Sequence, residues 1–349
     1  MARKSLRRIA LRVLAAVVAL AALPLSAAAV RSVAETAARP SDAQYQKLVE
    51  ATNAVVAVKV KAIADARSNA SLGQEREGSG VVIGKEGLVL TIGYLILEAD
   101  QIEVTDHQGQ TVPATAVAYD HATGFGLVRP MGTLASRPIR MGSALPVSQL
   151  DRLMIVTGGE EQNISIATVV SKRPFAGYWE YLIDDAIFTS PPRLDHSGAA
   201  LINQQGELVG VGSLFVLDAL APGERLPGNM FVPVDLLRPV LDEMVRTGQQ
   251  QGGRRPWIGV NSLEEDGRVK VVQVNDESPA AEAGIVAGDI ILSIDGQPVQ
   301  SLEQFYQALW GRGPAGVTVV LTVLHGPRMR EVTVNSIDRA EFMKKRPTI

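Results

Sequence analysis

Two apolar runs joined by a polar turn make up the segment GAALINQQGELVGVGSLFV (198–216), with the turn at 204–206. This pattern predicts a β-hairpin. The segments SGVVIGKEGLVLTIG (79–93) and IEVTDHQGQTVPATAVAYD (102–120) show the same pattern. Many short strands at this spacing predict a mainly β protein with a barrel or sandwich, because alternating β–α units would place long helical segments between the strands.

Helices are expected only at the edges of this β-rich region. Ser41 and Asp42 can cap a short helix that runs to about Glu50. The segment 235–248 is amphipathic at the helical period and ends at a glycine, so it predicts a closing helix. The polar segment 64–78 predicts an exposed loop.

The composition excludes several classes of function. The length of 349 residues predicts roughly two to three domains, and a hydrophobic content of 46% is too low for a polytopic membrane protein. Acidic residues outnumber basic ones, 37 to 34, which argues against a nucleic-acid partner because such a partner requires a basic surface. The chain has no cysteine, so it can form neither a disulfide nor a thiolate metal site.

The first 29 residues are typical of an export signal. A basic start leads into an uncharged run from Val13 to Val30 that ends near three consecutive alanines, 27–29. The run is long enough to span a bilayer if it is retained as an anchor. An exported chain without cysteines suits the bacterial periplasm.

A second unit of roughly 80–85 residues, the size of a small domain, follows the linker-like stretch QQQGGRRP (249–256). Its strands and helices alternate, with turn residues between them. The expected strands are 257–262, 269–274, 289–296, 316–324 and 329–334, and the expected helices are a short one after Ser278-Pro279 and a longer one over 301–311.

Seven ordered stretches between about Gln44 and Ile337 carry a family resemblance. They are GSGVVIGKEGLVLT, VAYDHATGFGLVR, HSGAALINQQGELVGVGS and NMFVPVDLL in the first unit, and RPWIGV, ESPAAEAGIVAGDIILSIDGQPV and VTVVLTVLHG in the second. The chain therefore resembles the HtrA/DegP-type proteins, which implies a trypsin-like double β-barrel followed by one PDZ domain. The resulting division is 1–29 for the signal peptide or N-terminal anchor, 30–248 for the double barrel, 249–256 for the linker, 257–337 for the PDZ domain and 338–349 for a C-terminal tail.

The resemblance implies a Ser-His-Asp triad, but two of its positions are changed. The family pattern Leu-Thr-Asn-Asn-His reads Leu-Thr-Ile-Gly-Tyr here, so Tyr94 stands at the general-base position. The aspartate position falls at Gly124. Ser197 keeps the nucleophile position, and Asp195 stands where the family has a glycine that shapes the oxyanion hole.

These replacements predict a loss of peptide hydrolysis. A serine hydroxyl is a weak nucleophile until an adjacent base accepts its proton. An ordinary phenol has a pKa near 10, so Tyr94 is protonated at pH 7. Gly124 has no side chain that could orient a base, and a carboxylate at Asp195 would repel a developing oxyanion unless it points away. Outside the family context, Ser197 would be interpreted as an ordinary turn residue.

Two alternatives would keep chemistry in the first unit. His121 or His196 could rebuild a dyad with Ser197, provided that either reaches hydrogen-bond distance. His121, His196 and Asp195 could instead bind a metal, but the sequence has no tight spacing such as His-x₃-His, so ordinary surface histidines are favoured. We therefore expect no metal and no cofactor.

The second unit retains a peptide-binding pattern. PDZ domains add an extended C-terminal peptide to an open sheet edge, and backbone amides of an apolar-Gly-apolar loop bind its carboxylate. Ile258, Gly259 and Val260 have this form. The helix over 301–311 should form the other wall of the groove, although some of its apolar residues must pack in the core.

These observations favour a non-proteolytic, exported HtrA-like protein that binds polypeptide C-termini or unfolded segments, as an adaptor or in envelope quality control. The alternative is an active serine endopeptidase that uses Ser197 with a non-standard base. The resemblance also implies a homotrimer in the periplasm, with membrane contact only if the N-terminal segment is retained.

Overall fold

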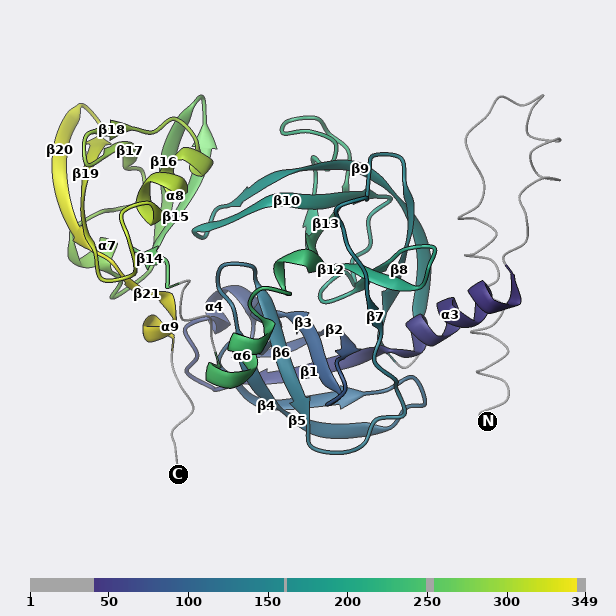
Figure 1. Cartoon of the computed structure of the whole chain (residues 1–349). Coiled ribbons are helices and arrows are strands. Elements are labelled where there is room, and N and C mark those ends of the chain that lie inside the picture. The colour runs from purple at the N-terminus through teal and green to yellow at the C-terminus, as the bar shows by residue number, and fades with distance from the viewer. Residues whose placement is uncertain (1–40, 160–161, 249–253, 344–349) are drawn as a thin grey trace, which may run out of the picture.

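The structure, a computed structural model, describes residues 41–159, 162–248 and 254–343. The predicted signal segment lies outside the described residues, as does most of the predicted linker. Two β units lie beside each other, and a third, smaller unit lies at their side (Figure 1). Within the described ranges, no helix is both long enough and apolar enough to cross a bilayer.

The first unit is a closed six-stranded barrel in the order β1-β2-β3-β6-β5-β4. The alternation of apolar residues along its strands places valines, leucines and isoleucines in the interior. Its strands are β1 (Val55–Ala62), β2 (Glu75–Ile83), β3 (Leu88–Ile92), β4 (Ala99–Thr105), β5 (Thr111–Tyr119) and β6 (Phe125–Pro130), and its helices are α3 (Asp42–Asn53), α4 (Asn69–Leu72) and α5 (Gly93–Ile96).

The second unit is also a barrel. Its strands follow the order β11-β8-β9-β10-β13-β12, and pairing of β11 with β12 closes the ring, while β7 pairs with the outside of β12. The strands are β7 (Arg140–Met141), β8 (Arg152–Thr157), β9 (Asn163–Gly177), β10 (Tyr181–Ser190), β11 (Ala200–Ile202), β12 (Glu207–Val216) and β13 (Gly228–Pro233). The hairpin predicted over 198–216 is the β11–β12 pair.

The structure corrects two expectations about local structure. The single helix predicted over 235–248 is divided into a 3₁₀ turn, η1 (Val234–Leu236), and a short helix, α6 (Leu241–Thr247). Pro239 lies between them, and proline interrupts a helix because it lacks an N–H and clashes with the preceding turn. The loop predicted over 64–78 contains α4 and the first residues of β2. The cap predicted at Ser41 is confirmed, since its hydroxyl accepts from the Gln44 N–H.

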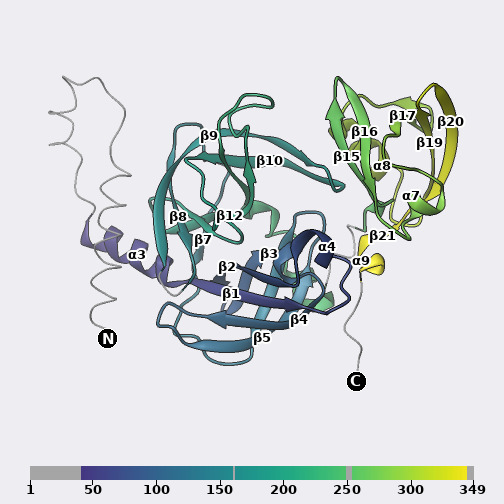
Figure 2. The ribbon, with the colours of Figure 1, turned by 180° about the vertical axis from the view of Figure 1, so that it is seen from behind.

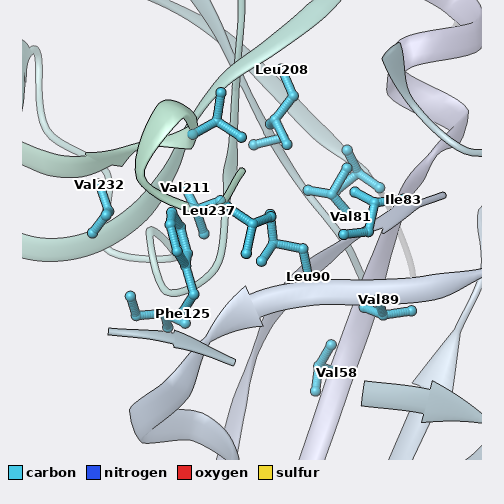
Figure 3. Packing of buried hydrophobic residues seen from close by; sticks show 14 of the residues in the cluster. Val58, Val81, Ile83, Val89, Leu90, Phe125, Leu208, Val211, Val232 and Leu237 are labelled. Atoms are coloured by element: carbon cyan, nitrogen blue, oxygen red, sulfur yellow. The ribbon is translucent and has the colours of Figure 1, made fainter. Parts of the chain in front are cut away.

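One apolar core joins the two barrels. Leu90 and Phe125 from the first barrel pack with Leu208 and Val211 from the second, and each is fully buried (Figure 3). Fully burying such a side chain contributes roughly 1.5–3 kcal/mol. The shared core therefore fixes the relative positions of the loops that the two barrels contribute to the site.

The third unit has the mixed β and α organisation predicted for a PDZ domain, with a six-stranded sheet whose main path runs β15-β16-β17-β19-β20 and in which β18 pairs with β17. Helix α8 packs against this sheet, and its apolar face lies in the core of the unit. Its elements are β14 (Pro256–Trp257), β15 (Val260–Glu265), β16 (Arg268–Val274), α7 (Pro279–Glu282), β17 (Ile290–Ile294), β18 (Gln297–Pro298), α8 (Leu302–Trp310), β19 (Thr318–His325), β20 (Arg328–Asn335), β21 (Ile337–Asp338) and α9 (Arg339–Phe342).

The closed end of the β9–β10 hairpin reaches from the second barrel toward β15 and α8 of the third unit (Figure 2). Leu182 on this hairpin is part of the apolar core of the third unit, and Ala176 packs against that core. The β9–β10 hairpin is therefore one contact between the third unit and the barrels, and the ion pair of Arg67 with Glu277 is another.

Candidate functional site

Ser197 lies in a rigid turn between β10 and β11. The Ser79 N–H donates to the Ser197 carbonyl oxygen at 2.8 Å, and the Gly198 N–H donates to the Gly212 carbonyl oxygen at 2.8 Å. Gly198 has φ +72°, and a Cβ there would lie 1.9 Å from the Ser79 carbonyl oxygen. Only glycine fits, so the turn that displays Ser197 is fixed by its neighbours.

The phenol of Tyr94, the α5 residue for which the resemblance implies the general-base position, contacts the Ser197 hydroxyl. Its Oη lies 2.8 Å from Ser197 Oγ and 2.8 Å from the Ser213 carbonyl oxygen. A carbonyl can only accept, so the phenol donates its proton to Ser213 and the Ser197 hydroxyl donates to Tyr94 Oη. Burial raises the pKa of Tyr94 to about 12. At neutral pH the phenol is therefore uncharged and cannot take the serine proton.

The space beside Gly124 is filled by another tyrosine. A Cβ at Gly124, which has φ +81°, would lie 2.9 Å from Tyr181 Oη. Tyr181 holds this place by donating to the Thr123 carbonyl oxygen at 2.7 Å. An aspartate side chain at position 124 would meet the Tyr181 hydroxyl, so the structure offers it no room in this arrangement.

Asp195 is held as a carboxylate close to Ser197. It accepts from Thr157 Oγ1 at 3.0 Å and forms an ion pair with Arg193 at 2.5 Å. Burial acts to raise the pKa of Asp195, but the hydrogen bonds and charge of Arg193 and the bond from Thr157 outweigh it, and the pKa is lowered. Asp195 and Ser197 line the same cleft, which has a volume of about 680 Å³. Within this cleft, the Asp195 carboxylate is bound by Thr157 and its charge is paired with that of Arg193.

The two histidines considered for a rebuilt dyad have other contacts. His196 Nδ1 lies 3.1 Å from the Arg193 carbonyl oxygen. The ring of His121 packs on Tyr119 with centroids 4.1 Å apart, and it lines a small cavity against the third unit together with Trp257 and Arg339. Burial lowers the pKa of His121 to about 3. Within the described ranges, no hydrogen bond joins either histidine to Ser197, and no cluster of side chains is suited to a metal ion.

The amides of Ile258, Gly259 and Val260 converge on a carboxylate, but that carboxylate belongs to the same chain. The N–H groups donate to the Glu180 side chain at 3.1, 2.7 and 3.0 Å. Gly259 has φ +89°, and a Cβ there would lie 2.3 Å from Ser278 Cβ, so only glycine allows this turn. We call these three residues the amide nest.

Glu180 is deeply buried in the amide nest, with 6% of its surface exposed. Burial raises its pKa to about 7, although the three N–H donors and the charge of Arg339 act in the opposite direction. No sequence pattern pointed to this residue, because Glu180 lies far from the nest along the chain, in the turn between β9 and β10.

Helix α8 was predicted to form the second wall of the peptide groove, opposite the sheet edge. Leu302, Phe305 and Leu309 are buried in the core of the third unit, whereas the Tyr306 hydroxyl donates to the Gly177 carbonyl oxygen at 2.7 Å. Of the apolar residues predicted along this helix, Tyr306 therefore forms a hydrogen bond to the β9–β10 hairpin.

Comparisons with known proteins agree with this architecture. The family model for the trypsin-like peptidase domain matches residues 78–211, and the model for the PDZ domain matches residues 256–335. Serine endoprotease DegS of Haemophilus influenzae is 29% identical over 269 residues, which cover 74% of this chain and 76% of that protein. The chain belongs to the HtrA family. The resemblance inferred from the sequence motifs is confirmed, including the single PDZ domain.

Other HtrA proteins extend the comparison. Serine protease PepD of Mycobacterium tuberculosis is 26% identical over 290 residues, and the alignment spans 76% of this chain but 62% of that protein. The crystal structure of the serine endoprotease from Yersinia pestis has a TM-score of 0.53 at 24% identity and covers 86% of this chain and 98% of that one. The HtrA-type protease AlgW with a tripeptide has a TM-score of 0.51 at 21% identity, over 88% and 99% of the two chains. These structures support the predicted fold.

Proposed function

We propose that this HtrA-family protein is non-proteolytic and recognises polypeptide C-termini or unfolded segments through its PDZ domain, as an adaptor or in envelope protein quality control. The observation that carries the first half is the contact between Ser197 Oγ and the Tyr94 phenol. A phenol whose pKa is raised to about 12 is not a base at neutral pH. The hydroxyl of Ser197 therefore lacks the activation that acyl transfer needs.

The second half is supported by the amide nest, whose three donors lie where a carboxylate can accept all of them. A terminal carboxylate has the same acceptor atoms as Glu180. PDZ domains bind C-termini in this way: the peptide adds as a strand to an open sheet edge, and backbone amides bind its carboxylate.

A location in the periplasm is part of this proposal. The basic and apolar composition of residues 1–29 supports export. A relative from Halomonas elongata, 24% identical over 283 residues, is described as a probable periplasmic serine endoprotease.

The test is covalent labelling of the full chain with a fluorophosphonate probe at pH 7.5, with Ser197→Ala as the control. We expect the same background signal from both proteins. Stoichiometric labelling that Ser197→Ala abolishes would replace this proposal with an active endopeptidase, because labelling requires an activated serine.

A further inference from the structure

The tip of the β9–β10 hairpin, residues 177–182, makes two contacts with the PDZ domain of the kind that a bound peptide makes. Its Glu180 carboxylate fills the amide nest at 2.7 to 3.1 Å. Two residues earlier, the Tyr178 carbonyl oxygen accepts from the Ser262 N–H on β15 at 2.8 Å. A carboxylate at the nest and a backbone bond to the edge strand are the two contacts by which an added peptide strand is held.

The opposite wall of the groove also contacts this tip. The Tyr306 hydroxyl on α8 donates to the Gly177 carbonyl oxygen at 2.7 Å and lies 3.3 Å from the Glu180 N–H, which donates to it. Leu182 is 7% exposed and belongs to the PDZ core. The hairpin tip therefore lies between β15 and α8 and forms hydrogen bonds to both elements.

The tip has further contacts on the PDZ side and one on the barrel side. Trp179 stacks on Tyr181 with centroids 5.3 Å apart, and the Trp179 carbonyl oxygen accepts from Arg339 on α9 of the third unit at 3.3 Å. Tyr181 is bound to the Thr123 carbonyl oxygen of the first barrel. Because the tip is tethered to the domain that it fills, its effective concentration is on the order of millimolar.

We infer that the hairpin tip is a built-in competitor that closes the PDZ groove, so that a polypeptide C-terminus binds only after it displaces Glu180 from the amide nest. This inference rests on the proposed recognition of C-termini and adds its regulation. The ligand is identified by its chemistry as a chain with a free terminal carboxylate and an extended segment before it. An amidated C-terminus offers no carboxylate and cannot replace Glu180.

The first measurement is hydrogen exchange of the full-length protein without peptide. We expect Glu180→Ala to accelerate exchange of the Ile258, Gly259 and Val260 amides by about tenfold or more, because these donors lose their buried acceptor. The matched control is Glu265→Ala, which removes an exposed PDZ glutamate that pairs with Lys270 outside the nest. Equal exchange in wild type, Glu180→Ala and the control would overturn the inference.

The second measurement is capture of a fluorescein-labelled decapeptide pool with a free carboxylate and a randomised last four residues, against the same pool with amidated ends. We expect Glu180→Ala to bind the carboxylate pool about tenfold or more tightly than wild type and Glu265→Ala do, because the tethered competitor is gone. The amidated pool should show no such gain.

The outcomes distinguish the closed groove from the proposed recognition of C-termini. Equal, measurable affinity for wild type and Glu180→Ala would overturn the closed groove but keep C-terminal recognition. No binding by either protein would overturn C-terminal recognition and, with it, the closed groove. Should Glu180→Ala fail to fold, Tyr306→Phe removes the bond to the Gly177 carbonyl oxygen and the bond from the Glu180 N–H, and it leaves the three nest amides and the Glu180 carboxylate in place. It should shift both measurements in the same direction by a smaller factor, and a lack of any shift would overturn the inference.

Discussion

The turn that carries Ser197 and the turn that carries Gly259 are alike in construction and differ in what occupies them. Each depends on a glycine with positive φ that admits no side chain, and each presents polar groups to a confined space. At Ser197 the neighbour is a neutral phenol, which leaves the hydroxyl unactivated. At Gly259 the neighbour is a carboxylate, which matches the amide donors.

Under the proposed function, this difference separates a serine that lacks an activating base from a peptide site that is filled by the chain itself. Reactivity at Ser197 would require changes at several side chains at once, because the base, its orienting partner and the space for that partner are all absent. Binding at the amide nest requires only that one hairpin tip moves away. The following predictions test this comparison from the largest expected effect to the smallest.

A single substitution at Tyr94 should not restore peptidase activity. We expect Tyr94→His to leave peptidase activity below about 10⁻⁴ of that of a complete triad, since loss of the orienting aspartate alone costs a triad about 10⁴-fold. Activity is measured on an unfolded, fluorescently quenched protein substrate, with Ser197→Ala as the background. Robust turnover by Tyr94→His would mean that another group orients the imidazole, and the space beside Gly124 would then not be decisive.

One methyl group added at Gly259, in the amide nest, should lower the stability of the protein. Gly259→Ala places a Cβ 2.3 Å from Ser278 Cβ, and Gly296→Ala is the matched control because Gly296 has φ +77° and open space around it. Both variants carry the cost of a positive φ, so their difference isolates the clash. We expect Gly259→Ala to lower the free energy of unfolding by about 2 kcal/mol more than the control. Urea denaturation followed by tryptophan fluorescence measures this, and equal losses would show that the nest can shift to admit a side chain.

The Tyr94 hydroxyl should contribute to the stability of the protein. Tyr94→Phe leaves the Ser213 carbonyl and the Ser197 hydroxyl without their shared partner, which should cost about 1–3 kcal/mol. Ser197→Ala and the double variant complete a double-mutant cycle that separates the two bonds. A neutral effect of Tyr94→Phe would indicate that water replaces the phenol, and the serine would then be open to solvent.

The barrel–PDZ contact should make stability depend on pH through His121. Burial lowers its folded pKa to about 3, below the unfolded value of 6.5, so the unfolded chain binds more protons between these values. Stability from this residue is therefore present above pH 6.5 and lost as the pH falls toward 3. Between pH 6 and pH 5 the loss should be about 1 kcal/mol. It is measured as the difference between wild type and His121→Phe, and identical pH profiles for the two would contradict it.

Much of the fold was predictable because its signals are local. Alternating apolar residues and glycine turns predicted the hairpins over 79–93 and 198–216, and Tyr94 and Gly124 could be placed by their flanking motifs. The helix predicted over 235–248 was wrong since the periodicity hides the effect of Pro239. The contact of Tyr181 with the space beside Gly124 depends on tertiary packing, which no local pattern contains.

The largest omission was Glu180. Its importance comes from three amides 78 to 80 positions further along the chain. A glutamate between two aromatic residues in a hairpin turn is ordinary as a sequence. Only the approach of two separately folded units gives it a buried partner, so pattern reasoning could predict the nest at Ile258–Val260 but not its occupant.

Glu180 and Tyr181 are consecutive residues, and this adjacency has a thermodynamic consequence. Glu180 fills the amide nest while Tyr181 fills the space beside Gly124. Any ligand whose binding to the PDZ domain moves this dipeptide also changes the free energy of occupying the barrel position. Linkage is reciprocal, so if a ligand beside Gly124 changes the affinity of a peptide for the nest, the peptide changes the affinity of that ligand by the same factor. The peptide bond between these two residues thus gives the amide nest and the space beside Gly124 a direct covalent connection.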